Sequence, residues 1–95
     1  MLLVRKLVWD SWNTKHVYRH HIIPEEVEEV CHSDPLVLRG QQKERLVLIG
    51  LTKVNRMLAV VLEGQGHGIY YPITAYEPDE KDKTLYKRLK GGGKK

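Results

Sequence analysis

Three apolar runs separated by short connections constrain the fold of this chain more than any other feature. The runs cover residues 45–52, 56–63 and 69–76, and only residues 53–55 and 64–68 separate them. Each run has the aliphatic and β-branched composition that favours strands. Because the connections are short, consecutive runs are expected to be neighbours in one sheet. We therefore predict three consecutive antiparallel strands.

The segment before these strands predicts two helices. Asp10 is a good N-cap residue for a helix over residues 10–21, and Pro24 suits the first position of a second helix over residues 24–32. In the first helix, a spacing of four residues aligns three side chains on one stripe: Trp12, His16 and His20. In the second helix, the apolar edge is predicted to consist of Val27, Val30 and Cys31.

Weaker strand and loop signals complete the sheet. Residues 2–8 predict a first strand near a sheet edge, residues 36–39 predict a short strand, and residues 40–44 predict a polar loop. Pro72 lies inside the third apolar run. Because proline has no N–H to donate, its position indicates an edge strand or a bulge.

The C-terminal part predicts one more helix and a tail. Asp79 is a suitable N-cap, and Leu85 and Leu89 are predicted to form the apolar contact of that helix. The whole pattern predicts an α+β fold: a single antiparallel sheet of about four strands, with the helices packed on one face. We expect one domain over residues 1–90 and a disordered Gly/Lys tail at 91–95.

Composition sets broad limits on function and location. The formal net charge of +4 permits nucleic-acid binding without requiring it. A single cysteine, Cys31, excludes an internal disulfide framework and is typical of a reducing compartment. No apolar run approaches the roughly 18 residues of a membrane span, and the N-terminal run is too short for a signal peptide. We therefore expect a cytoplasmic protein without membrane association.

The chain also carries an ordered set of motifs. Its first half contains WD-x-W-N-x-x-H-x-x-x-H followed by PEEVEEV, and three later blocks read RLVLIG, RMLAVV and ITA. This set resembles BrnT-type toxins in order and spacing over most of the chain. The resemblance implies a RelE-like fold, an endoribonuclease activity without a cofactor, and inhibition of translation by RNA cleavage. It also implies two partners, RNA and a cognate antitoxin, with assembly as a homodimer or as a hetero-oligomer with the antitoxin.

The chain departs from the BrnT pattern at two positions. The family's last strand commonly ends in Ala-Arg, whereas here Ala75 precedes Tyr76. Asp82 occupies the place of a family glutamate, and Tyr86 matches a family tyrosine. Loss of the arginine removes a charge that would stabilise phosphate, although tyrosine is able to stack on a base.

Histidine suits the proton transfers of RNA cleavage, and arginine suits the phosphate, because its planar fork binds two oxygens at once. Residues and resemblance together give a catalytic set: His20, Arg45, Arg56 and Tyr86. They also give a nucleic-acid-binding set: His16, Tyr76, Lys87 and Arg88.

Several alternatives stand beside this interpretation. His16 and His20 are often structural in such positions, and strand-end arginines are often only solvated. The His16–His20 spacing and the neighbouring Cys31–His32 pair also suggest zinc, but no clear third ligand completes a site, so we predict no metal. A further alternative to the ribonuclease is an RNA- or protein-binding module of the same fold with weakened catalysis.

Overall fold

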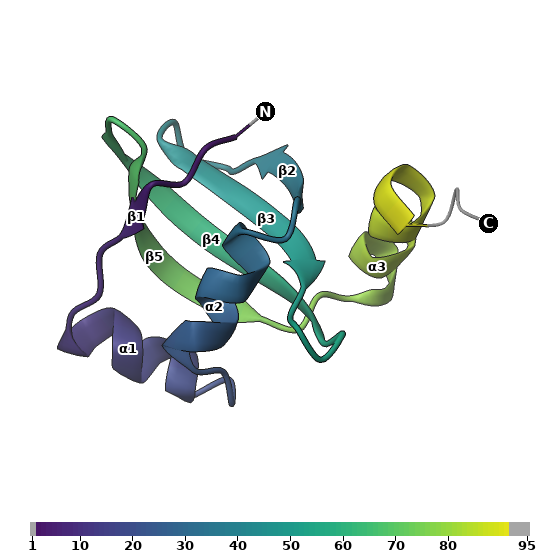
Figure 1. Cartoon of the computed structure of the whole chain (residues 1–95), viewed down its shortest axis with the longest axis horizontal. Coiled ribbons are helices and arrows are strands. Elements are labelled where there is room, and N and C mark those ends of the chain that lie inside the picture. The colour runs from purple at the N-terminus through teal and green to yellow at the C-terminus, as the bar shows by residue number, and fades with distance from the viewer. Residues whose placement is uncertain (1, 92–95) are drawn as a thin grey trace.

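The computed structural model describes residues 2–91 and shows a five-stranded sheet with helices on both faces (Figure 1). The strands lie in the order β1-β5-β4-β3-β2. Their bounds are β1 (Lys6–Leu7), β2 (Leu36–Arg39), β3 (Arg45–Leu51), β4 (Met57–Gly66) and β5 (Ile69–Tyr76). The helices are α1 (Ser11–Tyr18), α2 (Pro24–Cys31), α3 (Glu80–Tyr86) and a π-helical segment, η1 (Lys87–Gly91).

The α+β class and the antiparallel succession of β3, β4 and β5 are confirmed. The sheet differs from the prediction in having five strands, because β2 pairs with β3 and β1 adds to β5. It is also mixed rather than purely antiparallel, since β1 runs parallel to β5. A parallel neighbour is possible here because α1, α2 and three strands separate β1 from β5 in the chain.

The N-terminal elements are shorter than the sequence suggested. Of residues 2–8, only Lys6–Leu7 form a strand, at the predicted edge of the sheet. The first helix ends at Tyr18 rather than at residue 21. A left-handed His21, with φ of 61°, then turns the chain toward α2. The His21 carbonyl accepts a hydrogen bond from Arg56 Nη1 at 3.0 Å, a contact 35 residues away that the local pattern does not reveal.

The hairpin between β4 and β5 is tighter than the predicted loop over residues 64–68. Strand pairing continues to Gly66, and only His67 and Gly68 connect it to Ile69. Both connecting residues have positive φ, as a two-residue hairpin turn requires. Further along, a register irregularity between Val61 and Leu62 lies opposite Pro72, which confirms the bulge that proline suggested.

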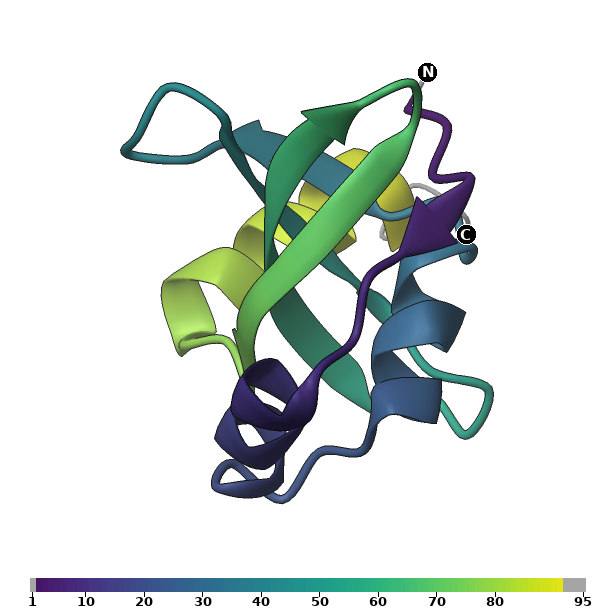
Figure 2. The same cartoon turned by 90° about the vertical axis from the view of Figure 1, so that its left-hand side faces the viewer.

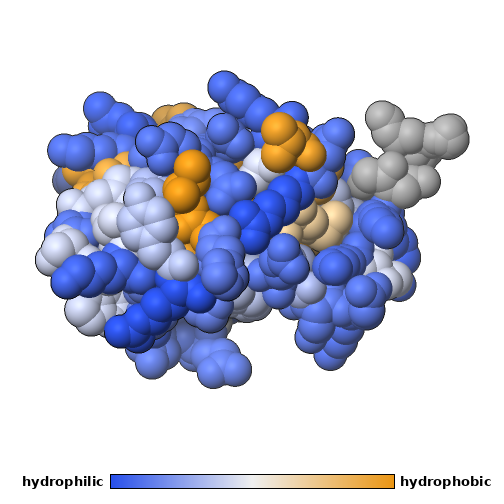
Figure 3. All heavy atoms as spheres, turned by 90° about the horizontal axis from the view of Figure 1, so that it is seen from below, coloured by the Kyte–Doolittle hydropathy of each residue, from blue (hydrophilic) through white to orange (hydrophobic). Residues whose placement is uncertain are grey.

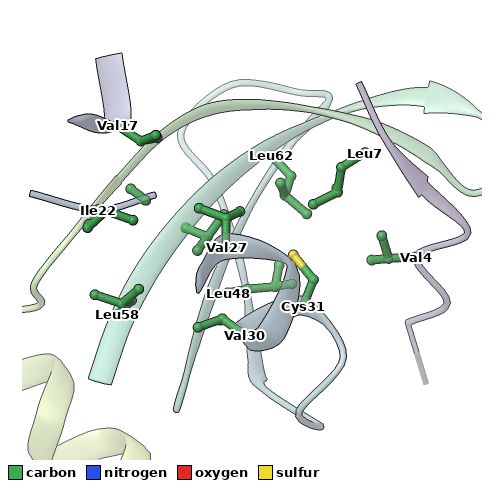
Figure 4. Packing of buried hydrophobic residues seen from close by; sticks show 12 residues of the cluster. Val4, Leu7, Val17, Ile22, Val27, Val30, Cys31, Leu48, Leu58 and Leu62 are labelled. Carbon is green, nitrogen blue, oxygen red and sulfur yellow. The ribbon is translucent and has the colours of Figure 1, made fainter. Parts of the chain in front are cut away.

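The helices do not share one face of the sheet, contrary to the prediction. Figure 2 shows α2 and α3 on opposite sides of the sheet, and Val17 of α1 belongs to the same apolar cluster as the buried residues of α2. The larger apolar core lies under α1 and α2 and includes Val27, Val30 and Leu48 (Figure 4). A smaller cluster on the opposite face joins Ile49 and Ala59 to Tyr86 of α3. Because strand residues alternate between faces, an apolar run buried on both faces needs a cover on each.

The last helix has the predicted cap but a different apolar contact. The Asp79 side chain accepts a hydrogen bond from the backbone N–H of Asp82, 2.9 Å away. Tyr86 is the buried residue, whereas Leu85 is half-buried and Leu89 is 57% exposed. The π-helical segment after Tyr86 changes the spacing along the helix, so Leu89 turns toward solvent. Of the predicted tail, Gly91 belongs to η1, and residues 92–95 lie outside the described residues.

Candidate nucleic-acid interface

A concavity of about 250 Å³ opens on the α3 face of the sheet. It lies between the loop after β2 and residues of β3, β4 and β5. Its lining residues are Gly40, Gln41, Gln42, Arg45, Val47, Val61 and Tyr76. The site therefore brings together Arg45 and Tyr76, two of the residues that the sequence marked for RNA.

The loop over residues 40–44 is folded back against the start of β3. Gly40 N–H donates to the Arg45 carbonyl at 2.9 Å, and Arg45 N–H donates to the Gln42 carbonyl at 3.1 Å. A Cβ on Gly40 would come within 2.8 Å of the Arg45 carbonyl oxygen, so this close approach needs glycine. The tight loop holds Gln41 and Gln42 at the rim of the concavity.

Arg45 carries the positive charge of this site. Its Nε is buried and has no hydrogen-bond partner, and within residues 2–91 its side chain forms no ion pair. Burying a charged donor without a partner is costly. An arginine side chain without a protein partner is available to bind an anion, because the two parallel N–H groups of its guanidinium match two oxygens of a phosphate or carboxylate.

Thr74 adds a second unsatisfied group on the same face. It pairs with Val61, a lining residue, and opposite residues of an antiparallel pair share a face. Its buried Oγ1 has no hydrogen-bond partner within the described part of the chain. Sequence reasoning missed Thr74, although a hydroxyl inside an apolar strand was a signal that pointed to it.

Tyr76 contributes an aromatic ring and a hydroxyl. Burial raises the pKa of this phenol, and the carboxylates of Asp82 and Asp79 raise it further. The hydroxyl therefore stays protonated at neutral pH and acts as a hydrogen-bond donor. Asp82, which takes the place of the BrnT glutamate, is thus one of the two carboxylates that raise the pKa of Tyr76.

Arg56 lies at a different place and is already paired. Its Nη1 donates to both carboxylate oxygens of Glu26 at 3.1 Å and to the His21 carbonyl at 3.0 Å. Its Nη2 lies 3.4 Å from the Glu77 carboxylate. The side chain, 27% exposed, thus ties the start of α2 to the end of β5. Arg56 does not line the concavity with Arg45, and its three partners indicate that it stabilises the fold.

Trp12 and His16 of α1 form an aromatic row with His20, which lies in the turn after the helix. The Trp12 and His16 rings are stacked, with centroids 5.0 Å apart and planes at 24°. The His16 and His20 rings are 6.0 Å apart and tilted by 47°. The predicted stripe is therefore confirmed, but it lies on α1 and the turn after it, and none of its residues lines the concavity.

The remaining predicted residues divide between core and surface. Tyr86 is buried beneath α3 in the smaller apolar cluster. Lys87 and Arg88 are exposed on η1. Tyr86 is thus placed to stabilise the packing of α3, while Lys87 and Arg88 leave positive charge on the α3 side of the sheet.

No metal-binding cluster of three or more His, Cys, Asp or Glu side chains occurs within residues 2–91. His32 instead places its two ring nitrogens 2.9 Å from the Glu28 carbonyl and 3.2 Å from the Val4 carbonyl. Burial, and then the Glu28 carboxylate, raises the pKa of the Cys31 thiol to about 12. Both side chains of the suggested zinc pair are therefore engaged in the packing of α2.

Asn13 is a further residue that sequence reasoning passed over. It is fully buried, and its amide Nδ2 donates to the Val8 and Pro72 carbonyls, each at 3.0 Å. Its Oδ1 accepts from the Asp10 N–H at 2.9 Å, while Asp10 accepts from the Asn13 N–H at 3.0 Å. The WD-x-W-N motif thus fixes α1 against β5, and the row of rings takes its position from Asn13.

Comparisons with protein-family models, curated proteins and solved structures gave no match. No helix within residues 2–91 is long and apolar enough to cross a membrane.

Proposed function

We propose that this chain is an RNA-acting toxin domain of the BrnT kind, with a RelE-like fold, that inhibits translation and is neutralised by a cognate antitoxin. One observation carries the proposal: within residues 2–91, the buried Arg45 Nε has no hydrogen-bond partner, the Arg45 side chain forms no ion pair, and Arg45 and Tyr76 line the same concavity. The net charge of +4 favours approach of a polyanion to this site.

In this proposal, Arg45 binds two non-bridging oxygens of an RNA phosphate. The Thr74 hydroxyl and the protonated Tyr76 hydroxyl donate to the same region or to the adjoining ribose. The Tyr76 ring also offers a surface for a base. Arg45 would stabilise the charge that builds up on the phosphate when the 2′-hydroxyl attacks.

A second candidate function is binding without efficient cleavage. Two observations favour it: the position of the BrnT arginine holds Tyr76, and none of the lining residues is a histidine. Loss of one preorganised transition-state contact typically costs about two to three orders of magnitude in rate. We therefore expect the parent protein to bind RNA well and to cleave it slowly.

The test compares RNA binding and cleavage by purified parent protein with those of three variants. Arg45→Ala should weaken both, and Tyr76→Arg should raise cleavage by restoring a cation next to Arg45. Arg39→Ala is the matched control, because Arg39 is an exposed arginine of β2 that does not line the concavity. Growth arrest on induced expression, with and without the Arg45→Ala change, tests toxicity in cells.

The outcomes separate the two candidates. Slow cleavage that Tyr76→Arg accelerates supports a weakened ribonuclease. RNA binding that depends on Arg45, with no cleavage by the parent or by Tyr76→Arg, supports the binding module. Equal binding and cleavage by the parent and by Arg45→Ala would refute the proposed site.

A further inference from the structure

The exposed side of α1 combines stacked rings with unpaired positive charge. Trp12 is 56% exposed and is stacked on His16, which in turn lies against His20. At about 100° per residue, the side chains of Trp12, Lys15, His16 and Arg19 fall within an arc of roughly 100°. Rings and cations therefore share one face of the helix.

The charges on this face are not neutralised locally. Within residues 2–91, Lys15 and Arg19 form no ion pair. The chain has no acidic residue between Ser11 and His21. The nearest carboxylate in sequence, Asp10, is already bonded to the Asn13 N–H and to the Tyr71 hydroxyl. The surface is thus complementary to a polyanion.

The surroundings of α1 argue against a mainly apolar partner. Figure 3 views the molecule from below, the side on which α1 lies in Figure 1, and this side is mostly hydrophilic. Its apolar residues form small, separate patches. A large protein interface normally has an apolar centre, which this side lacks. Stacking rings beside a row of cations match the needs of a single-stranded nucleic acid.

We propose that the Trp12–His16–His20 row is a binding surface for single-stranded RNA, separate from the concavity on the α3 face. The free face of Trp12 stacks on an unpaired base, because the other face is covered by His16. Lys15 and Arg19 contact the phosphates on either side of that base. The inference goes beyond the proposed function in naming single-stranded RNA and a second site for it.

The experiment measures binding of an adenine ribo-oligonucleotide of about ten nucleotides, a length suited to a stacking groove. Trp12→Ala should weaken binding by about 5- to 150-fold, the range for losing one aromatic–base stack. Trp12→Phe should retain most of the affinity. Tyr18→Ala is the matched control, since Tyr18 is 53% exposed on another side of the same helix.

Two further readouts distinguish stacking from a general loss of structure. The parent's tryptophan fluorescence should be quenched by the oligonucleotide, and the quenching should disappear in Trp12→Phe, which keeps Trp9. Lys15→Gln and Arg19→Gln should each reduce the slope of log affinity against log salt by roughly 0.7, the value for one phosphate contact with a single strand. Lys53→Gln, an exposed lysine elsewhere, should leave the slope unchanged.

All measurements are repeated in an Arg45→Ala background, so that the two sites are tested separately. Trp12-dependent quenching that persists in Arg45→Ala supports the second site, even if the protein proves unable to cleave RNA. Arg45-dependent cleavage with binding indifferent to Trp12→Ala upholds the proposed function and overturns this inference. Absence of oligonucleotide binding by the parent, or equal affinity for duplex RNA, also overturns it.

Discussion

Replacement of Asn13 should loosen α1 from the sheet and destabilise the whole domain. The Asn13 side chain makes three hydrogen bonds of 2.9–3.0 Å and is fully buried. Because β1 pairs with Ile69 and Tyr70 alone among residues 2–91, the Asn13 amide provides a donor to the Pro72 carbonyl on the β1 side of β5, beyond the end of that pairing. In Asn13→Ala, the carbonyls of Val8 and Pro72 lose their donor.

The magnitude follows from the number of bonds. At about 1 kcal/mol for each hydrogen bond, Asn13→Ala should cost roughly 3 kcal/mol of unfolding free energy. Small domains have about 5–15 kcal/mol in total, so this is a large fraction. A domain of this size loses about 4–8 °C in Tm for each kcal/mol, which gives a decrease of roughly 12–24 °C. Urea unfolding and thermal unfolding followed by circular dichroism measure both values.

Asn13→Asp is the matched variant, because it keeps the side-chain volume and the acceptor for the Asp10 N–H. It places a carboxylate oxygen against the two carbonyls, so it should also be strongly destabilised at pH 7. Protonation of the new carboxyl restores one donor, so its stability relative to the parent should improve as the pH falls toward 4. An Asn13→Asp protein within about 0.5 kcal/mol of the parent at pH 7 would refute the hydrogen-bond argument.

Three other predictions concern groups outside the concavity. Arg56→Ala should lower the unfolding free energy by about 1.5–3 kcal/mol, the range for hydrogen bonds to charged groups. The control Arg39→Ala should lower it by less than about 0.5 kcal/mol. Equal effects of the two changes in urea unfolding would contradict the structural role of Arg56. With its pKa raised to about 12, Cys31 should react with iodoacetamide at pH 8 far more slowly in the folded than in the urea-unfolded protein, and equal rates would show that the thiol is accessible. Elemental analysis of the purified protein should find no stoichiometric zinc. A content of about one zinc per chain that is lost in His16→Ala or in His20→Ala would reverse that expectation.

Local chemistry in the sequence was sufficient for much of the fold. Asp10 and Asp79 cap helices because their side chains reach backbone N–H groups three residues away. Pro24 begins α2 because proline fits the first turn. The runs that became β3, β4 and β5 were recognisable because their apolar content and short connections leave few other arrangements. The caps and the helix start depend on residues within one turn, and the strand pairing depends on connections of only a few residues.

Long-range packing decided the rest of the fold. The parallel addition of β1 to β5 joins residues more than sixty positions apart, as in the Lys6–Ile69 pair. The position of α3 on the opposite face depends on where Tyr86 finds apolar neighbours, and Leu89 was an equally good candidate by spacing alone. A periodic pattern identifies which residues need burial, but it does not identify the surface that buries them.

The same division is clearest for the two arginines that the sequence marked for the site, of which only Arg45 lines the concavity. Arg45 and Arg56 both precede apolar strand runs, and nothing in their local sequence distinguishes them. The sequence by itself determined that two cations stand at strand ends. The tertiary structure decided that Glu26 and Glu77 neutralise Arg56, while among residues 2–91 no carboxylate pairs with Arg45, which lines the concavity with Tyr76. The physical reason is that the charge available to a ligand depends on which opposite charges the fold brings within about 4 Å, and those come from distant segments of the chain.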